Sequence, residues 1–95
     1  MPALHDQFAQ AQKDVNNLAE RPDNETMLKL YALYKQATKG DAAGQRPAGF
    51  DFVARAKFDA WSALKGKSPE DAMHEYIALA KTLVVGRQRI HFPVI

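Results

Sequence analysis

The chain of 95 residues has the length of one domain, and 46% of its side chains are hydrophobic, which suffices for one core without cross-links. It has no cysteine, which excludes disulfides and thiolate metal sites, and its net charge of +2 is too small to favour non-specific DNA binding. No apolar run has the length of a membrane span, and the polar amino-terminal segment with Asp6 is unlike a signal peptide, so we expect a cytoplasmic protein.

The first twenty residues predict an amphipathic helix of about 15 residues, because apolar side chains recur at alternating spacings of four and three. The sequence Glu20-Arg21-Pro22 ends this helix, since the residue before a proline avoids helical geometry. The apolar stripe expected to face the core comprises Leu4, Phe8, Ala11, Val15 and Leu18.

A second helix is predicted to begin at a cap formed by Asp23 or Asn24 and to end near Thr38, before Gly40. Its leucines, at positions 28, 30 and 33, are expected to reach the core. Residues 40–49 contain three glycines and a proline, which predicts the longest loop of the chain.

A third helix is predicted over about residues 51–65, with Gly66 as its end. Phe52 and three further apolar residues at intervals of four are expected to point inward, and Trp61 is assigned to the core. The other three inward positions are Ala56, Ala60 and Leu64.

The start of the fourth helix has the clearest signal, with Ser68 as cap, Pro69 in the first helical position and two acidic residues after it. Gly86 is expected to end or fray this helix, so that residues 1–86 form the domain and residues 87–95 an apolar tail. The core stripe of the fourth helix comprises Ala72, Met73, Tyr76, Ile77, Ala80 and Leu83.

Four amphipathic helices, with no stretch of period two and no internal repeat, predict an all-α four-helix bundle with a long loop between helices 2 and 3. The sequence offers little for catalysis. The three histidines lie on separate segments, the serines have no paired base, and the long loop lacks the lysine of a phosphate-binding loop. We therefore predict no enzyme activity, no catalytic residues, no metal site and no cofactor.

The second helix carries the residues that are most informative about binding. Tyr31, Tyr34 and Lys35 stand at positions i, i+3 and i+4, which places two phenol rings and an ammonium group on one side of a helix. The first 30 residues have a net charge of −2 and the remainder +4, which suits a compact anionic ligand. Our hypothesis is that this surface, with Lys57 and Tyr76, binds a nucleotide phosphate that carries an apolar tail. Taken alone, the same tyrosines could be packing residues and the lysines solvated ones.

The sequence also resembles the acyl-CoA-binding protein family. The resemblance covers about residues 4–83, and its fragments follow in order: MLxxYxxYKQATxGD over residues 27–41, RP at 46–47, AKFDAW over 56–61, LKGxS over 64–68 and AMxxYI over 72–77. Each fragment alone is weak, but their order and spacing together are specific. Phe58 replaces a tryptophan usual in the family, and Asn16 stands where a basic residue is often found.

The resemblance implies an up-down-down-up bundle that binds, buffers and transports long-chain acyl-CoA esters as a monomer, without catalysis and without stable membrane insertion. It implies that Tyr31, Lys35 and Lys57 contact the phosphate on the ribose 3′ position and that Tyr34 lies near the adenine ring. Tyr76 and Phe58 complete the predicted site. Enzymes that use acyl-CoA are possible partners, and nucleic acid is not expected. The alternatives are a helical protein-interaction module that uses the tyrosine face and the apolar tail, and a small nucleic-acid-binding domain.

Overall fold

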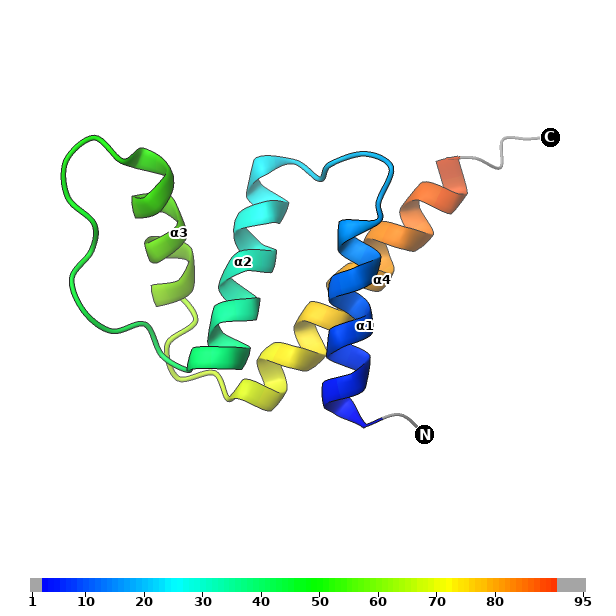
Figure 1. Ribbon diagram of the computed structural model, residues 1–95, viewed down its shortest axis with the longest axis horizontal. Helices are drawn as coiled ribbons and strands as arrows, with labels where there is room; N and C mark the ends of the chain where they lie inside the picture. The colour runs from blue at the N-terminus through cyan, green and yellow to red at the C-terminus, as the bar shows by residue number, and fades with distance from the viewer. Residues whose placement is uncertain (1–2, 91–95) are drawn as a thin grey trace.

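The computed structural model describes residues 3–90, which form four α-helices and no strands (Figure 1). The helices are α1 (Leu4–Asn16), α2 (Asn24–Lys39), α3 (Phe52–Ser62) and α4 (Pro69–Ile90). Their directions are up, down, down and up, and residues 40–51 form the long connection between α2 and α3. The predicted all-α class and four-helix architecture are therefore confirmed.

The helix starts follow the capping signals in the sequence. The backbone N–H of Thr26 donates to the Asp23 carboxylate at 2.8 Å, and the N–H of Asp71 donates to the Ser68 hydroxyl at 3.1 Å. These bonds satisfy N–H groups that the first turn of a helix leaves without partners. Gly40 ends α2 with a φ of 81°, a backbone conformation that favours glycine.

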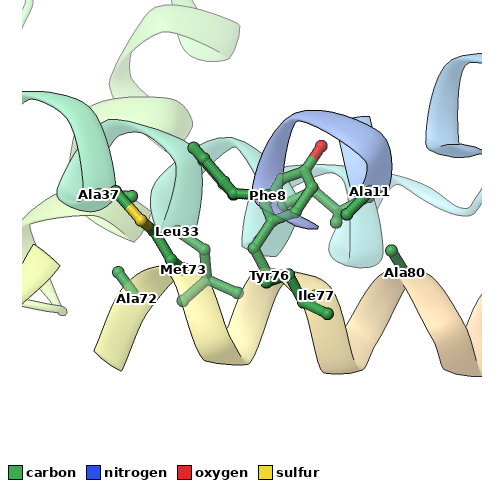
Figure 2. Close-up of a cluster of buried hydrophobic side chains, with 10 residues drawn as sticks. Phe8, Ala11, Leu33, Ala37, Ala72, Met73, Tyr76, Ile77 and Ala80 are labelled. Carbon is green, nitrogen blue, oxygen red and sulfur yellow. The ribbon is translucent and has the colours of Figure 1, made fainter. Parts of the chain in front are cut away.

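The core is shared by α1, α2 and α4. Phe8 of α1 lies between α2 and α4, and Leu33 of α2 packs beside Met73 of α4 (Figure 2). The stripe predicted for the fourth helix is confirmed, with Leu83 at the partly buried edge of the core. The stripe predicted for the first helix is confirmed from Leu4 to Val15, but Leu18 lies beyond the end of α1 and outside the core. The fully buried cluster comprises Phe8, Ala11, Leu30, Leu33, Ala37, Ala72, Met73, Tyr76, Ile77 and Ala80.

Helix α3 packs against α2 alone and contains no fully buried residue. The prediction that Phe52 points inward is wrong, because its side chain is 68% exposed. Phe52 is the first residue of α3, next to the long loop, whereas Leu64 lies in the turn after α3 and packs against the edge of the core. The end of the stripe nearest Leu64 is half-buried, and Phe52 is left in solvent.

Helix α4 continues through Gly86 to Ile90, so the prediction that Gly86 ends the helix is wrong. A single glycine inside a long helix costs only about 1 kcal/mol relative to alanine, which the preceding buried turns offset. The predicted tail therefore begins inside α4, and residues 91–95 lie outside the described residues. The division of the chain at residue 86 stays a prediction.

The carboxyl end of α2 is joined to the α3–α4 turn by a polar cluster. The buried side chain of Gln36 donates through Nε2 to the Asp41 carboxylate and to the Lys67 carbonyl, both at 2.8 Å. The Asp41 carboxylate also accepts the N–H of Gly66 at 2.9 Å. These bonds fix the end of α2 relative to the turn that follows α3, and so they set the angle between α2 and α3.

Candidate functional site

The predicted site residues on α2 divide between two sides of that helix. Tyr31 and Lys35 are half-buried and lie toward α3, with the Lys35 ammonium 6.0 Å from the centre of the Tyr31 ring. Tyr34 is 39% exposed and lies toward α1, where its ring stacks on Phe8 at 6.1 Å between ring centres. The three side chains thus form an arc rather than one cluster.

Helix α3 adds a second ammonium group to the Tyr31 side of this arc. The Nζ atom of Lys57 lies 5.2 Å from the centre of the Tyr31 ring, so ammonium groups from two different helices surround one aromatic ring. Both distances are within the range in which a cation is attracted to the face of an aromatic ring. The structure therefore brings together Tyr31, Lys35 and Lys57, as the hypothesis requires.

Neither of these ammonium groups is neutralised by a carboxylate. Among residues 3–85, whose side chains the structure describes, the ion pairs join Arg46 to Asp59 and Lys67 to Glu75, and neither pair includes Lys35 or Lys57. An anion bound beside the Tyr31 ring would be attracted by both ammonium groups. This arrangement is therefore suited to receive a phosphate.

Trp61 holds α3 against the end of α2. Its indole N–H donates to the carbonyl of Gly40 at 2.8 Å, and the Lys35 ammonium lies 5.0 Å from the centre of its ring. The side chain is half-buried and is not part of the core cluster, so the assignment of Trp61 to the core is wrong. Because α3 does not reach the core, its tryptophan instead forms the contact between α2 and α3.

Tyr76 lies apart from the two lysines in the structure. Its side chain is 6% exposed and belongs to the core, where its ring meets the Phe8 ring edge-on at 5.1 Å between centres (Figure 2). Burial raises the pKa of its hydroxyl above the ordinary value, with a smaller contribution from Tyr34. That hydroxyl forms no hydrogen bond with the described part of the chain. Tyr34, Phe8 and Tyr76 thus form an aromatic cluster next to the lysine pair along α2.

Phe58 is half-buried on α3, and no ring contact links it to the other predicted residues in the described part of the chain.

A cavity of about 450 Å³ lies between α1 and α4, lined in part by Asp6, Gln10 and Lys81. None of the six predicted site residues lines this cavity. The lysine pair and its ring therefore belong to a separate surface between α2 and α3.

The residues that hold the long loop to α3 were not predicted from the sequence. The guanidinium of Arg46 forms two parallel hydrogen bonds with the Asp59 carboxylate, at 2.7 and 2.8 Å. The Arg46 guanidinium holds the pKa of the Asp59 carboxyl below its usual value. Both residues lie in stretches that carry the family resemblance, RP and AKFDAW, which was the signal available for them.

The described residues form neither a metal site nor a membrane-spanning helix. No group of three or more metal-ligating side chains is close enough together to hold an ion. No helix in this part of the chain is both long and apolar enough to cross a bilayer.

Comparison with known proteins decides the family. The model of the family described as "Acyl CoA binding protein" matches residues 5–80. The chain belongs to the acyl-CoA-binding protein family. It is 49% identical over 77 residues to the acyl-CoA-binding protein of Saccharomyces cerevisiae. This match covers 81% of this chain and 88% of that protein. It is 47% identical over 81 residues to acyl-CoA-binding domain-containing protein 6 of Arabidopsis thaliana. This match covers 85% of this chain and 88% of that protein.

Solved structures of acyl-CoA-binding proteins share the fold. The crystal structure of Oryza sativa acyl-CoA-binding protein 2 superimposes with a TM-score of 0.87 at 39% identity, covering 92% of this chain and 97% of that one. The solution structure of the yeast acyl-CoA-binding protein gives a TM-score of 0.67 at 48% identity, with coverage of 83% and 92%. Enoyl-CoA delta isomerase 2 of Rattus norvegicus is 45% identical over 83 residues, but the match spans only 21% of that protein. Its name therefore carries no argument for an activity of this chain.

Proposed function

We propose that this protein binds long-chain fatty acyl-CoA esters non-covalently, buffers them and transports them inside the cell. Membership of the acyl-CoA-binding protein family supports the ligand class. The observation that carries the proposal is the pair of ammonium groups from α2 and α3 around the ring of Tyr31. A carrier needs affinity without chemistry, and this site offers charge, aromatic faces and apolar surface.

The phosphate on the ribose 3′ position is proposed to bind between Lys35 and Lys57. A phosphate at this point would accept charge-assisted hydrogen bonds from both ammonium groups, and such bonds are roughly twice as strong as neutral ones. The Tyr31 hydroxyl is proposed to donate a further hydrogen bond. Lysine suits this role because a single phosphate at the meeting point of two helices requires no forked donor.

The adenine ring is proposed to stack on Tyr34. This ring is exposed enough to be covered and is held from behind by Phe8. Stacking of a base on an aromatic side chain is worth on the order of 1–3 kcal/mol. Tyr76 is next to Tyr34 in the same cluster, and its hydroxyl, without a partner among the described residues, is proposed to donate to the ligand. Phe58 is proposed to contribute apolar contact from α3.

The acyl chain is proposed to lie between α2 and α3, toward the amino-terminal ends of both helices. These helices run in the same direction, so residues one turn before Tyr31 and one turn before Lys57 lie at the same end (Figure 1). Leu28 on α2 is half-buried there, and Val53 on α3 is 65% exposed. Each buried methylene contributes roughly 0.8 kcal/mol, which partial burial and ordering reduce. Affinity should therefore rise steeply with chain length.

We further propose that the protein is a cytoplasmic monomer that delivers its ligand to enzymes that use acyl-CoA. One phosphate site and one adenine surface per chain support a stoichiometry of one ligand per monomer. The same two anchors explain why free fatty acid, which lacks the phosphate, should not compete. We propose no catalytic role, because the site residues contain no acid–base pair oriented on a scissile bond.

Calorimetric titration tests the ligand class. Palmitoyl-CoA should bind with one site per chain, and free CoA should bind weaker by several orders of magnitude, because the chain contributes much of the affinity. Palmitate and a short DNA duplex should give no heat. Equal affinity for CoA and palmitoyl-CoA would contradict the proposal, and duplex binding with a steep dependence on salt would favour the nucleic-acid alternative.

Single lysine substitutions test the site. Lys35→Ala and Lys57→Ala should each weaken palmitoyl-CoA binding about tenfold or more, because each removes a hydrogen bond to a charged group. Melting temperature and helical content should stay nearly unchanged. Lys29→Ala is the matched control, since Lys29 is an exposed lysine on α2 and should have no effect on affinity. If Lys35→Ala or Lys57→Ala unfolds the protein instead, these lysines are structural and the site is misplaced.

A further inference from the structure

The hydrogen bonds between the carboxyl end of α2 and the turn after α3 lie outside the proposed ligand site. Gln36 Nε2 donates to the Asp41 carboxylate and to the Lys67 carbonyl, and the same carboxylate oxygen accepts the N–H of Gly66. Three hydrogen bonds thus tie α2 to the backbone that follows α3. We refer to Gln36, Asp41, Gly66 and Lys67 as the α2–α3 joint.

The two lysines of the phosphate site lie on either side of this joint. Lys35 directly precedes Gln36 on α2, and Lys57 lies one turn before Trp61, whose indole N–H bonds to the Gly40 carbonyl. One turn is about 6 Å of helix, so a rotation of α3 by about 10° at the joint moves the backbone of Lys57 by about 1 Å. Binding constellations need precision of about 0.5 Å. The geometry of the joint therefore decides whether the two ammonium groups meet.

Apolar packing fixes the angle of α3 only weakly, because α3 contains no buried residue. Gln36, by contrast, is completely buried, and its Oε1 atom accepts no hydrogen bond from the described residues. Burying an acceptor without a donor lowers stability, and an apolar side chain of the same length would avoid that cost. The benefit of a glutamine at this position therefore lies in the two directional bonds that Nε2 makes.

We propose that Gln36 and Asp41 are positioning residues of the phosphate site. They hold α3 at the angle that brings Lys57 to the Tyr31 ring, and they do not contact the ligand themselves. This inference rests on the proposed binding of the 3′-phosphate between Lys35 and Lys57. Asp41 is the better residue to substitute first, because it is exposed whereas Gln36 is buried.

Two substitutions of Asp41 that change the charge equally separate positioning from electrostatics. Asp41→Ala and Asp41→Asn both remove a negative charge, which by itself favours binding of a phosphate. Asparagine keeps an oxygen that can accept from Gln36 and Gly66, and alanine does not. In calorimetric titration, Asp41→Ala should weaken palmitoyl-CoA binding about fivefold, because the bonds that orient α3 are lost. Asp41→Asn should restore the affinity of the unsubstituted protein or exceed it.

A double-mutant cycle shows whether the effect passes through Lys57. In a protein that carries Lys57→Ala, Asp41→Ala should weaken palmitoyl-CoA binding less than twofold, because the contact that it misplaces is already absent. Its effect on the melting temperature should be the same in both backgrounds. A merely structural role would lower the affinity equally in both.

Asp23→Ala is the matched control, because Asp23 is also an exposed aspartate that accepts a backbone N–H, but at the other end of α2. It should lower the melting temperature by loss of a helix cap and leave palmitoyl-CoA affinity within twofold. Circular dichroism verifies that each variant folds. If Asp41→Ala does not fold, Gln36→Met takes its place with the same expected loss, since methionine keeps the length of the buried side chain and removes its two bonds.

The outcomes distinguish this inference from the proposed function. If Lys57→Ala leaves palmitoyl-CoA binding unchanged, the phosphate site is misplaced and the positioning role falls with it. If Lys57→Ala weakens binding, three results overturn the positioning role alone. These are no loss of affinity in Asp41→Ala, an equal loss in Asp41→Asn, and an equal loss from Asp41→Ala with and without Lys57.

Discussion

Helices α1, α2 and α4 differ from α3 in how they are held. The first three share a cluster of ten buried side chains, whereas α3 has no buried residue and, among the helices, packs only against α2. Helix α3 is held by directional polar contacts: the hydrogen bond from Trp61 to Gly40 and the paired hydrogen bonds between Arg46 and Asp59. The difference predicts that truncations in α1, α2 and α4 lower stability more than truncations on α3 do.

The proposed phosphate site lies at the junction of these two regions. Lys35 belongs to α2, which the core holds rigidly, and Lys57 belongs to α3, which it does not. Segments with few buried apolar contacts open at lower free energy than the core. A ligand that bridges the two lysines should therefore order α3, and substitutions in the two regions should have separable effects on stability and on affinity.

The largest effect is expected from a core truncation. Leu33→Ala should lower the free energy of unfolding by about 2–5 kcal/mol, because Leu33 is almost completely buried and its removal leaves a cavity. Val53→Ala is the matched truncation on α3 and should change the free energy of unfolding by less than about 0.5 kcal/mol, since Val53 is exposed. Urea denaturation measures both. Similar losses for the two variants would remove the distinction between the regions.

A smaller effect is expected at the contact between α2 and α3. Trp61→Phe keeps an aromatic ring but removes the indole N–H that the Gly40 carbonyl accepts, which should cost about 0.5–1.5 kcal/mol of stability. Palmitoyl-CoA affinity should also fall severalfold, because Lys35 lies over the Trp61 ring and Lys57 shares its helix. Ser62→Ala is the neighbouring control. If Trp61→Phe leaves both quantities unchanged, Trp61 does not position α3.

Tyr76→Phe separates packing from ligand contact at a core residue. The ring should stay against Phe8, and stability should change by less than about 0.5 kcal/mol, because the hydroxyl has no bond to the described residues. Palmitoyl-CoA affinity should fall about three- to tenfold if this hydroxyl donates to the ligand. Unfolding and titration of the same sample provide both values. Unchanged affinity would restrict Tyr76 to the core.

The smallest effect is expected from acid titration of the loop contacts. The Arg46 guanidinium lowers the pKa of Asp59, and the N–H of Gly66 and the Gln36 amide lower that of Asp41. A carboxyl whose folded-state pKa is depressed stabilises the fold above its unfolded-state pKa of about 4, and this stability is lost as the pH falls through the folded-state pKa. Asp59→Asn should therefore unfold with a shallower dependence on pH below about 4 than the unsubstituted protein. Because both carboxylates are exposed, the difference should be slight, and an equal slope would remove the contribution of Asp59.

Local signals in the sequence predicted most of the fold. The caps at Asp23 and Ser68 and the apolar stripes of α1 and α4 act within one or two helical turns, so they could be recognised from spacing alone. Phe52 and Gly86 could not be placed in this way. The orientation of Phe52 depends on α3 having a single neighbour, and the passage of α4 through Gly86 depends on packing that precedes it.

The site was predicted less completely, because its residues act across helices. The resemblance selected Tyr31, Lys35 and Lys57, which the structure brings together, and their roles stay predictions. The burial of Tyr76 was predicted by the apolar stripe of the fourth helix and not by the resemblance. The contact from Trp61 to the Gly40 carbonyl also escaped the sequence analysis, since a backbone acceptor leaves no trace in the residue pattern.

The most direct test of the phosphate site compares two ligands on two proteins. Palmitoyl-CoA and its analogue without the 3′-phosphate are titrated into the unsubstituted protein and into Lys57→Ala. If Lys57 binds that phosphate, the substitution should weaken palmitoyl-CoA binding about tenfold or more and leave the affinity for the dephosphorylated analogue unchanged. An equal loss of affinity for both ligands would contradict the account, because Lys57 would then act somewhere other than on the 3′-phosphate.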